Sequence, residues 1–185
     1  MGQPKALLPC GPNDNFVSRV VGTLRDGGAA GAFVVGREED GALRRELERF
    51  GPFATFIINP QPDRGQLSSL IAGLNAADRP GVRAVMVTPV DVPLIRADTV
   101  ATLLATFSAT LAPIVRAVHG GAHGHPVIFA RAVFDDLRHA DPARGAKSVL
   151  RAHQALIVDV EVNDPGVLTD VDAPEDYERV FGHRP

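Results

Sequence analysis

The sequence predicts an α/β fold with a largely parallel sheet, because two hydrophobic periods alternate along its first part. Short apolar runs that suit buried parallel strands occupy residues 32–35, 53–58 and 84–87. Around them, apolar residues recur at i, i+3, i+4 and i+7, the spacing of a helix that packs one face on a core. These helical stripes cover residues 17–24, 43–50, 67–74 and 100–107. Strands that alternate with helices in this way build parallel sheets.

The pattern changes in the second part of the chain. Apolar segments at 114–118 and 127–129 flank a stretch rich in glycine and histidine, which predicts a hairpin or a bent pair of strands. The elements expected after it are short helices around residues 133–137 and 149–150, a strand at 155–162 and a final helix that carries residues 177–181. No internal repeat or linker divides the chain, so we expect one domain over residues 1–185.

The composition is that of an ordinary globular protein, with 45% hydrophobic and 22% charged residues among 185. A net charge of −3 speaks against nucleic acid or an anionic membrane as a partner. No apolar stretch approaches the roughly 20 residues that cross a bilayer, and the N-terminal residues do not resemble a signal peptide. We therefore expect a cytoplasmic protein. Cys10 is the only cysteine, which excludes an internal disulfide and favours a small buried thiol.

Asp91 stands in a stiff turn that follows the strand at 84–87. Pro89 and Pro93 restrict the backbone on both sides of it. In open parallel sheets, ligands bind beyond the carboxyl ends of the strands, where this turn would lie. A carboxylate there suits Mg²⁺, which commonly takes one or two carboxylates together with substrate phosphates. The alternative is a solvated turn aspartate.

A second acidic segment lies near the C-terminus. Asp172 comes three residues before Glu175 and two before Pro174, a spacing that predicts a capping box at the start of the last helix. Capping alone would account for Asp172. A metal role for Asp172, or for Asp170, requires that side chain to lie near Asp91, which the spacing along the sequence leaves open.

Two segments have features of a phosphate site. Residues 65–70 open a helix with a glycine and two serines, and the free N–H groups at a helix N-terminus favour anions. The alternative there is simple N-capping by a serine. At the N-terminus, Lys5 precedes an apolar pair, where it would either meet a nucleotide phosphate or stand as a surface lysine.

The stretch at 119–126 contains three histidines and allows two interpretations. A metal-binding tract is one of them. Structural zinc usually takes four ligands that include cysteine, so we favour a hairpin turn that leaves His119 and His123 in solvent. His125, placed before Pro126 at the start of an apolar strand, is the histidine expected to face a cleft.

In this order, the motifs resemble those of the MobA-like nucleotidyltransferases, and most closely the molybdenum cofactor cytidylyltransferase branch. The resemblance runs from Met1 to about Phe181. Residues 1–5 resemble the end of a glycine-rich nucleotide loop, and Asn59 with residues 65–70 resembles a second substrate-binding segment. The other similar segments are the metal-binding turn at 89–94, the substrate-side motifs at 124–127 and 164–168, and the closing segment at 168–177 that carries a second metal carboxylate.

The resemblance implies a Rossmann-like three-layer α/β/α nucleotidyltransferase fold with a mostly parallel sheet. Residues 1–110 would form the nucleotide-binding half and residues 111–185 the acceptor-binding half. Family members begin with a strand and a loop of the type Leu-Ala-Ala-Gly-x-Ser-x-Arg ahead of the Met-Gly pair, and this sequence lacks that usual first strand and loop. We expect a gap at the centre of the sheet. We interpret Met1 as a start assigned too late, in preference to a shortened form or a natural loss of activity.

The implied reaction transfers a nucleoside monophosphate, CMP from CTP, to a phosphorylated acceptor of the molybdopterin type and releases pyrophosphate. Alternatives within the class are guanylyl transfer to molybdopterin and transfer to another phosphorylated sugar or small molecule. An alternative of another class is a non-catalytic module that binds a nucleotide, the cofactor or a receiving molybdoenzyme.

The resemblance also implies roles for individual residues. Asp91 and Asp172 would hold Mg²⁺, and Lys5 and Asp91 would be catalytic, with Lys5 offsetting charge on the α-phosphate and the leaving pyrophosphate. The expected acceptor-binding residues are His125 and Pro126. The expected nucleotide-binding residues are Gly2, Pro4, Lys5, Asn59, Gly65, Gln66, Ser68 and Ser69. Lys147 departs from the family pattern, in which an arginine is commoner at this position.

Overall fold

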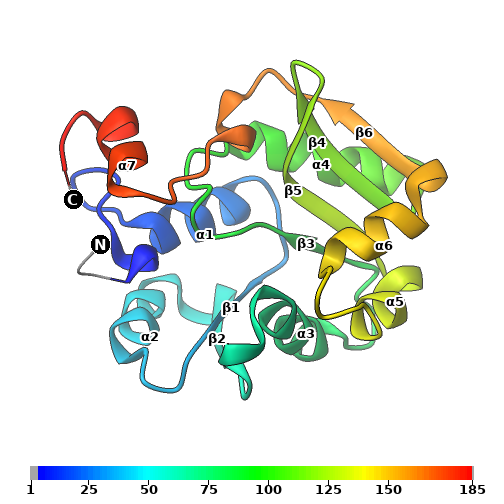
Figure 1. Cartoon of the computed structure of the whole chain (residues 1–185), viewed down its shortest axis with the longest axis horizontal. Coiled ribbons are helices and arrows are strands. Elements are labelled where there is room, and N and C mark those ends of the chain that lie inside the picture. Colours follow the sequence, from blue (N-terminus) through cyan, green and yellow to red (C-terminus); the bar gives the residue numbers. More distant parts are fainter. Residues whose placement is uncertain (1–3, 185) are drawn as a thin grey trace.

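The computed structural model describes residues 4–184 and contains seven α-helices and six β-strands in that range (Figure 1). The strands are β1 (Ala32–Gly36), β2 (Ala54–Ile58), β3 (Ala84–Val87), β4 (Ile114–His119), β5 (Ala122–Ala130) and β6 (Ile157–Glu161). The helices are α1 (Phe16–Asp26), α2 (Gly41–Leu47), α3 (Gln66–Ala77), α4 (Ala97–Thr110), α5 (Phe134–Arg138), α6 (Ala146–Ala152) and α7 (Pro174–Phe181). Every predicted element is present, with ends that differ by a few residues. None of the described helices combines the length and apolar character that a membrane crossing requires.

The strands form two separate hydrogen-bonded sheets. β1 and β2 pair in parallel, and the other sheet has the order β3-β5-β4-β6. Within it, β5 runs antiparallel to both β3 and β4, whereas β4 and β6 are parallel. Strands β3, β4 and β6 therefore share one direction, which confirms the mostly parallel sheet. No hydrogen-bonded ladder joins β1 to β3 within residues 4–184, in agreement with the expected gap.

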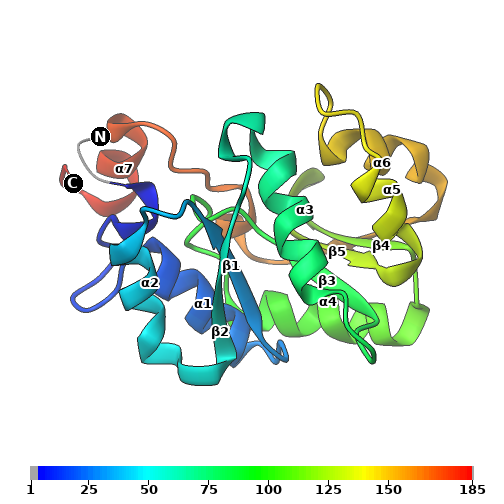
Figure 2. The ribbon, with the colours of Figure 1, turned by 90° about the horizontal axis from the view of Figure 1, so that it is seen from below.

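Helices cover both faces of the sheets and give the three-layer arrangement. Figure 2 shows α3, α5 and α6 above the four-stranded sheet and α4 below it. Helix α3 contacts β1, β2 and β3, so it packs across both sheets. Helix α1 contacts β1 and α4 on the opposite side.

The two faces of the four-stranded sheet follow the alternation of a β-strand. In β5, Ile128 and Ala130 belong to the core beneath α4, while Val127 and Phe129 belong to the core beneath α3 and α5. β4 and β5 are joined by Gly120 and Gly121, whose φ angles of 57° and 79° suit a two-residue hairpin turn. The predicted hairpin is therefore confirmed.

A smaller core joins the N-terminal segment to the last helix. Its buried members are Leu8, Cys10, Phe16, Val171 and Tyr177. The Tyr177 hydroxyl also donates a hydrogen bond of 2.7 Å to the carbonyl oxygen of Pro9. Burial raises the pKa of the Cys10 thiol to about 11, which agrees with an inert buried cysteine. Figure 1 shows α7 beside this N-terminal segment.

Residues 164–168 form a structural joint. The Asp164 carboxylate is only 2% exposed and accepts hydrogen bonds from Arg96 N, Thr99 Oγ1 and Gly166 N. The Asp164 side chain is therefore enclosed and satisfied within the fold, and the resemblance of residues 164–168 to a substrate-side motif stays a prediction. Gly166 sits so close to Leu94 that an added Cβ would lie 2.1 Å from the Leu94 carbonyl oxygen.

The last helix begins one residue later than predicted. Ala173 is its N-cap residue and Pro174 its first residue, a favoured position for proline. The Asp176 carboxylate, rather than that of Glu175, reaches back and accepts hydrogen bonds from Ala173 N (3.0 Å) and Asp172 N (3.2 Å). The capping role predicted for the Asp172 side chain is therefore wrong, and that side chain is available for other contacts.

We expect Gly166→Ala to lower the free energy of unfolding by about 1–3 kcal/mol, because its Cβ would overlap the Leu94 backbone. Chemical denaturation measures this change. Gly22→Ala in α1 is the control, since its Cβ would meet nothing closer than 4.0 Å and alanine is the better helix former. Equal unfolding midpoints for the two variants would contradict the close approach at Gly166.

We expect Asp176→Ala to lower the thermal unfolding midpoint by roughly 2–4 °C at neutral pH, and Asp172→Ala to lower it less. The hydrogen bond from Ala173 N, helped by Arg179, lowers the pKa of the Asp176 carboxyl in the folded protein. Its stabilising effect is therefore present at neutral pH and disappears as the pH falls through that lowered value. A larger loss for Asp172→Ala than for Asp176→Ala would restore the original capping prediction.

Candidate functional site

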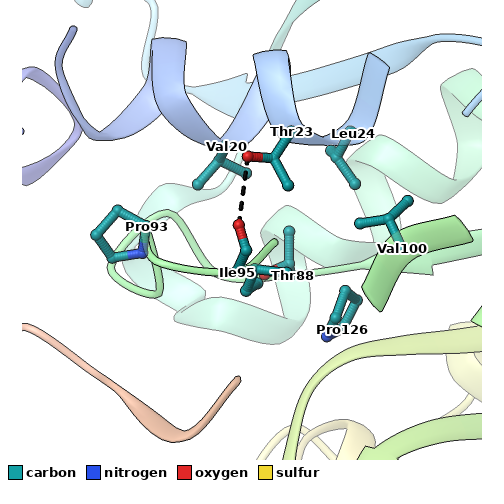
Figure 3. A pocket seen from close by; sticks show the side chains of 8 residues that line it. All are labelled: Val20, Thr23, Leu24, Thr88, Pro93, Ile95, Val100 and Pro126. Carbon is teal, nitrogen blue, oxygen red and sulfur yellow. Dashed lines mark hydrogen bonds between the residues drawn. The ribbon is translucent and has the colours of Figure 1, made fainter. Parts of the chain in front are cut away.

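The candidate site begins at the turn that leaves β3. Val92 is fully buried, while the neighbouring Asp91 side chain remains 25% exposed at the surface of the turn. The Thr23 hydroxyl of α1 lies 3.4 Å from the Ile95 carbonyl oxygen, which ties the end of the turn to that helix. Figure 3 shows the apolar hollow beneath the turn, and its lining residues are Val20, Thr23, Leu24, Thr88, Pro93, Ile95, Val100 and Pro126.

The C-terminal acidic segment docks directly on this turn. Val171 N donates a hydrogen bond of 2.9 Å to the Asp91 carbonyl oxygen, and the Val171 side chain is fully buried. Because neighbouring side chains of an extended segment point to opposite sides, burial of Val171 directs Asp170 and Asp172 away from the core. Both carboxylates are thereby placed next to Asp91.

Lys5 completes the cluster from the N-terminal segment. It begins a short 3-10 turn, Lys5–Leu7, that is followed by the buried Leu8. Its Nζ lies 2.6 Å from Asp172 Oδ1 and 3.4 Å from Asp91 Oδ2. The structure thus brings together three predicted residues that are 86 and 167 positions apart in the chain. Asp172 therefore lies near Asp91, which is the condition for a shared metal that the sequence left open.

The electrostatics of the cluster reflect three carboxylates around one ammonium group. Burial alone would lower the pKa of Lys5, but the hydrogen bond and charge of Asp172 and the charge of Asp91 outweigh it, so the pKa is raised. Burial and the charge of Asp91 raise the pKa of the Asp170 carboxyl, only partly opposed by His125 and Lys5. The site therefore has an excess of negative charge that favours additional cations.

His125 and Pro126 approach the same site from β5. Burial lowers the pKa of His125, although the charges of Asp170 and Asp91 act in the opposite direction. Its imidazole is therefore neutral at pH 7 and available as a hydrogen-bond donor or acceptor. Pro126 is buried and faces the hollow beneath the turn (Figure 3). Contact of either residue with an acceptor stays a prediction.

A second group of predicted residues follows β2. Asn59 is 4% exposed, and its Nδ2 lies 2.8 Å from Ser68 Oγ and 3.0 Å from Ser69 Oγ. Gly65 precedes α3 with a φ of 78° and is its N-cap residue, and the Ser68 hydroxyl donates to the Gly65 carbonyl oxygen at 2.7 Å. Serine N-capping, the alternative for this segment, is absent from the described helix α3, whose N-cap makes no side-chain hydrogen bond.

The predicted nucleotide-binding residues thus fall into two groups. Asn59, Gly65, Ser68 and Ser69 form one hydrogen-bonded group, with Gln66 exposed in the first turn of α3. Lys5 belongs to the acidic cluster, and the neighbouring Pro4 is exposed with its carbonyl oxygen bonded to Leu7 N. Within residues 4–184, no hydrogen bond or ion pair links the two groups. Gly2 lies outside the described residues.

Two carboxylates fit a hard divalent cation. Asp91 and Asp172 already share one positive charge, the ammonium group of Lys5. In the described part of the chain, no group of three or more histidine, cysteine, aspartate or glutamate residues could hold a metal by itself. A metal ion at Asp91 and Asp172 would therefore complete its shell with water and phosphate oxygens, as Mg²⁺ commonly does.

The histidines of the tract at 119–126 do not form a metal-binding group with one another or with acidic residues in the described part of the chain. His119 Nδ1 lies 2.8 Å from the Val162 carbonyl oxygen, and His123 Nε2 lies 3.5 Å from Asp159 Oδ2. These contacts fasten the hairpin to β6 and the loop after it, and the His123 side chain remains 55% exposed. The hairpin turn and the exposure of His123 are confirmed, whereas the expectation that His119 lies in solvent is wrong, because His119 is half-buried and hydrogen-bonded.

Some residues that build the site escaped the sequence-based reasoning. Val171 and Tyr177 position the acidic segment, and Asp176 supplies the helix cap assigned to its neighbours. The buried Val171 between two aspartates was an available signal, because an apolar residue flanked by acids predicts one buried and two exposed side chains.

Residues 1–156 match the MobA-like NTP transferase domain. Purine catabolism protein PucB of Bacillus subtilis (strain 168) is 27% identical over 188 residues, which cover 97% of this chain and 89% of PucB. The crystal structure of Rv0371c from Mycobacterium tuberculosis H37Rv has a TM-score of 0.81 at 21% identity, over 99% of this chain and 92% of that one. Its complex with manganese has a TM-score of 0.76 at 22% identity, over 98% and 94%.

Molybdopterin-guanine dinucleotide biosynthesis protein A from Archaeoglobus fulgidus shares the fold with a TM-score of 0.65 at 15% identity, over 96% of this chain and 89% of that one. The family match spans most of the sequence, and the solved structures reproduce the fold over nearly all of it. The chain therefore belongs to the MobA-like NTP transferase family and is a nucleotidyltransferase.

Proposed function

We propose that this nucleotidyltransferase transfers CMP from CTP to a phosphorylated acceptor of the molybdopterin type and releases pyrophosphate. The convergence of Lys5, Asp91 and Asp172 at one point carries the proposal. Transfer at phosphorus depends mainly on positioning and on positive charge held at the triphosphate. The choice of CTP and molybdopterin rests on the resemblance of the motifs to the cytidylyltransferase branch. A protein named for molybdopterin-guanine dinucleotide biosynthesis shares the fold, which supports this class of acceptor.

The proposed reaction needs positive charge near the phosphate oxygens and no covalent intermediate with the protein. An oxygen of the acceptor phosphate forms a bond to the α-phosphorus of CTP. The bond from that phosphorus to the oxygen bridging to the β-phosphate breaks, and its electron pair leaves with pyrophosphate. Because the attacking oxygen is already anionic, no protein base has to remove a proton. The lone buried Cys10 therefore plays no part.

Each residue of the acidic cluster has a proposed role. Asp91 and Asp172 would hold Mg²⁺, which when bound offsets charge on the phosphate oxygens. The manganese complex of Rv0371c supports a divalent ion in this family. Lys5 would neutralise charge on the α-phosphate and the leaving pyrophosphate. His125, neutral and half-buried beside the cluster, would donate or accept a hydrogen bond from the acceptor.

The second group of residues would seat the nucleotide. Gly65 opens α3, and the N–H groups of Gln66 and Leu67, which precede the hydrogen bond from Ser68 N to the Gly65 carbonyl oxygen, would favour a phosphate. Asn59 fixes both serine hydroxyls of this turn. A buried amide that holds two hydroxyls gives the loop a defined shape before any ligand arrives.

Pyrophosphate release with Mg²⁺, molybdopterin and each of CTP, GTP, ATP and UTP tests the substrates. We expect turnover with CTP above that with the other nucleotides. Turnover with GTP alone would replace cytidylyl by guanylyl transfer. Nucleotide or molybdopterin binding with no turnover for any nucleotide would support a non-catalytic module instead.

We expect Asp91→Asn to lower the turnover rate by about 100-fold or more, because one of two metal-binding carboxylates is lost. The measurement is the initial rate of pyrophosphate release at saturating nucleotide. Asp26→Asn is the control, since Asp26 is an exposed aspartate paired with Arg25 at the far end of α1. Retention of more than half of the activity by Asp91→Asn would remove Asp91 from the site.

We expect Ser68→Ala to raise the KM for the nucleotide by about fivefold with a smaller change in kcat, because the hydroxyl shapes the turn before α3. Ser148→Ala is a matched control. The hydroxyl and the backbone N–H of Ser148 both donate to the Gly145 carbonyl oxygen before α6, as those of Ser68 donate to Gly65. Gly145 also has a positive φ. An equal rise in the nucleotide KM for both variants would contradict a nucleotide site at the start of α3.

A further inference from the structure

Lys5 occupies the position between the two carboxylates proposed as metal ligands. Its Nζ lies 2.6 Å from one carboxylate oxygen and 3.4 Å from another, on Asp172 and Asp91. Within residues 4–184, no other lysine, arginine or histidine forms an ion pair with either aspartate. The charge of Asp170 also interacts with the charges of Lys5, Asp91 and Asp172. Among residues 4–184, Lys5 is thus the basic side chain that pairs with both of these carboxylates.

A metal ion and this ammonium group compete for the same oxygens. Mg²⁺ binds carboxylate oxygens at about 2.0–2.1 Å, and a metal shared by Asp91 and Asp172 would lie within a few ångströms of the present Nζ position. Two cations at that separation repel each other strongly, more so at a partly buried site. A metal ion bound to both aspartates therefore excludes the present contacts of Lys5 with them.

The lysine arm can leave without disturbing the core. Its side chain is 34% exposed and extends from a short 3-10 turn. The chain is anchored directly after this turn, at Leu8. The Leu8 side chain is only 2% exposed, and the Leu8 carbonyl oxygen accepts a hydrogen bond from Phe16 N. A change of side-chain rotamer moves the ammonium group while Leu8 stays in place.

We propose that Lys5 is the resident counter-ion of Asp91 and Asp172 and that a divalent metal ion must displace its ammonium group from these two carboxylates. This inference rests on the proposed function, because it assumes that these aspartates bind the metal. The displaced ammonium group gains a new partner only when a triphosphate is present. Metal alone therefore binds weakly, and metal and nucleotide load the site together.

The test is titration of the nucleotide-free protein with Mn²⁺, followed by calorimetry or by the electron paramagnetic resonance of free Mn²⁺. We expect Lys5→Met to bind Mn²⁺ about tenfold more tightly than the wild type, because the competing charge is gone. Lys147→Met is the matched control. Lys147 is the only other lysine of the chain and lies exposed on α6, so its loss removes the same charge away from the site.

Asp91→Asn separates failure of this inference from failure of the proposed function. If Asp91→Asn binds Mn²⁺ as the wild type does, the metal site itself is misplaced and both proposals fall. If Asp91→Asn loses Mn²⁺ but Lys5→Met binds no more tightly than Lys147→Met, only the displacement by the metal is overturned.

A spectroscopic readout serves as a second measurement that needs no variant. Because the chain has two lysines, the ¹³Cε signals of labelled lysine report on Lys5 and Lys147 separately. Addition of diamagnetic Mg²⁺ should shift the Lys5 signal and leave the Lys147 signal in place. An unchanged Lys5 signal at Mg²⁺ concentrations that saturate the site would overturn the proposal.

Discussion

The contact between the C-terminal acidic segment and the turn after β3 decides whether this chain has a site at all. The carboxylates of Asp91, Asp170 and Asp172 repel one another, at a cost of about 1–4 kcal/mol for a pair some 4 Å apart near a protein surface. Two opposing interactions hold them in place. The ammonium group of Lys5 pairs with Asp91 and Asp172, and large side chains are buried behind the acidic segment. Full burial is worth roughly 1.5–3 kcal/mol for each such residue, and the small core contains Leu8, Phe16, Val171 and Tyr177. Apolar burial and the charge of Lys5 together therefore offset the repulsion.

The elements of the fold follow from local patterns, whereas the site does not. Helical and strand periods along the sequence predict every element, because each pattern reports which face of one element is buried. The meeting of Lys5 with Asp172 depends on contacts between distant parts of the chain, such as the hydrogen bond from Tyr177 to Pro9. No local pattern contains that information. The family resemblance did imply that Asp91 and Asp172 come together, because the motifs follow one another in the order found in that family.

Errors of the sequence-based reasoning came from residue types that serve two purposes. Glu175 and Asp176 are adjacent acids, and a shift of one residue decides which of them caps α7. Gly166 lies in a segment that resembles a substrate-side motif, and its missing side chain makes room for the Leu94 carbonyl. Asp164 belongs to the same motif and is a buried acceptor of three hydrogen bonds. A sequence motif therefore shows that a glycine is required at a position. It does not show whether the space beside that glycine is filled by a ligand or by another part of the backbone.

The division of the strands into two sheets assigns a particular task to α3. The group of residues proposed to seat the nucleotide follows β2, and the acidic cluster follows β3. Because no ladder joins β1 to β3 within residues 4–184, backbone pairing does not fix the distance between these groups. Helix α3 packs on β1, β2 and β3, and its own first turn contains Ser68 and Ser69. The packing of one helix therefore sets how a triphosphate would meet the carboxylates, if it binds at the N-terminus of α3 as proposed. Within the described residues, side-chain packing of α3, rather than a hydrogen-bonded ladder, therefore determines how the two groups are aligned.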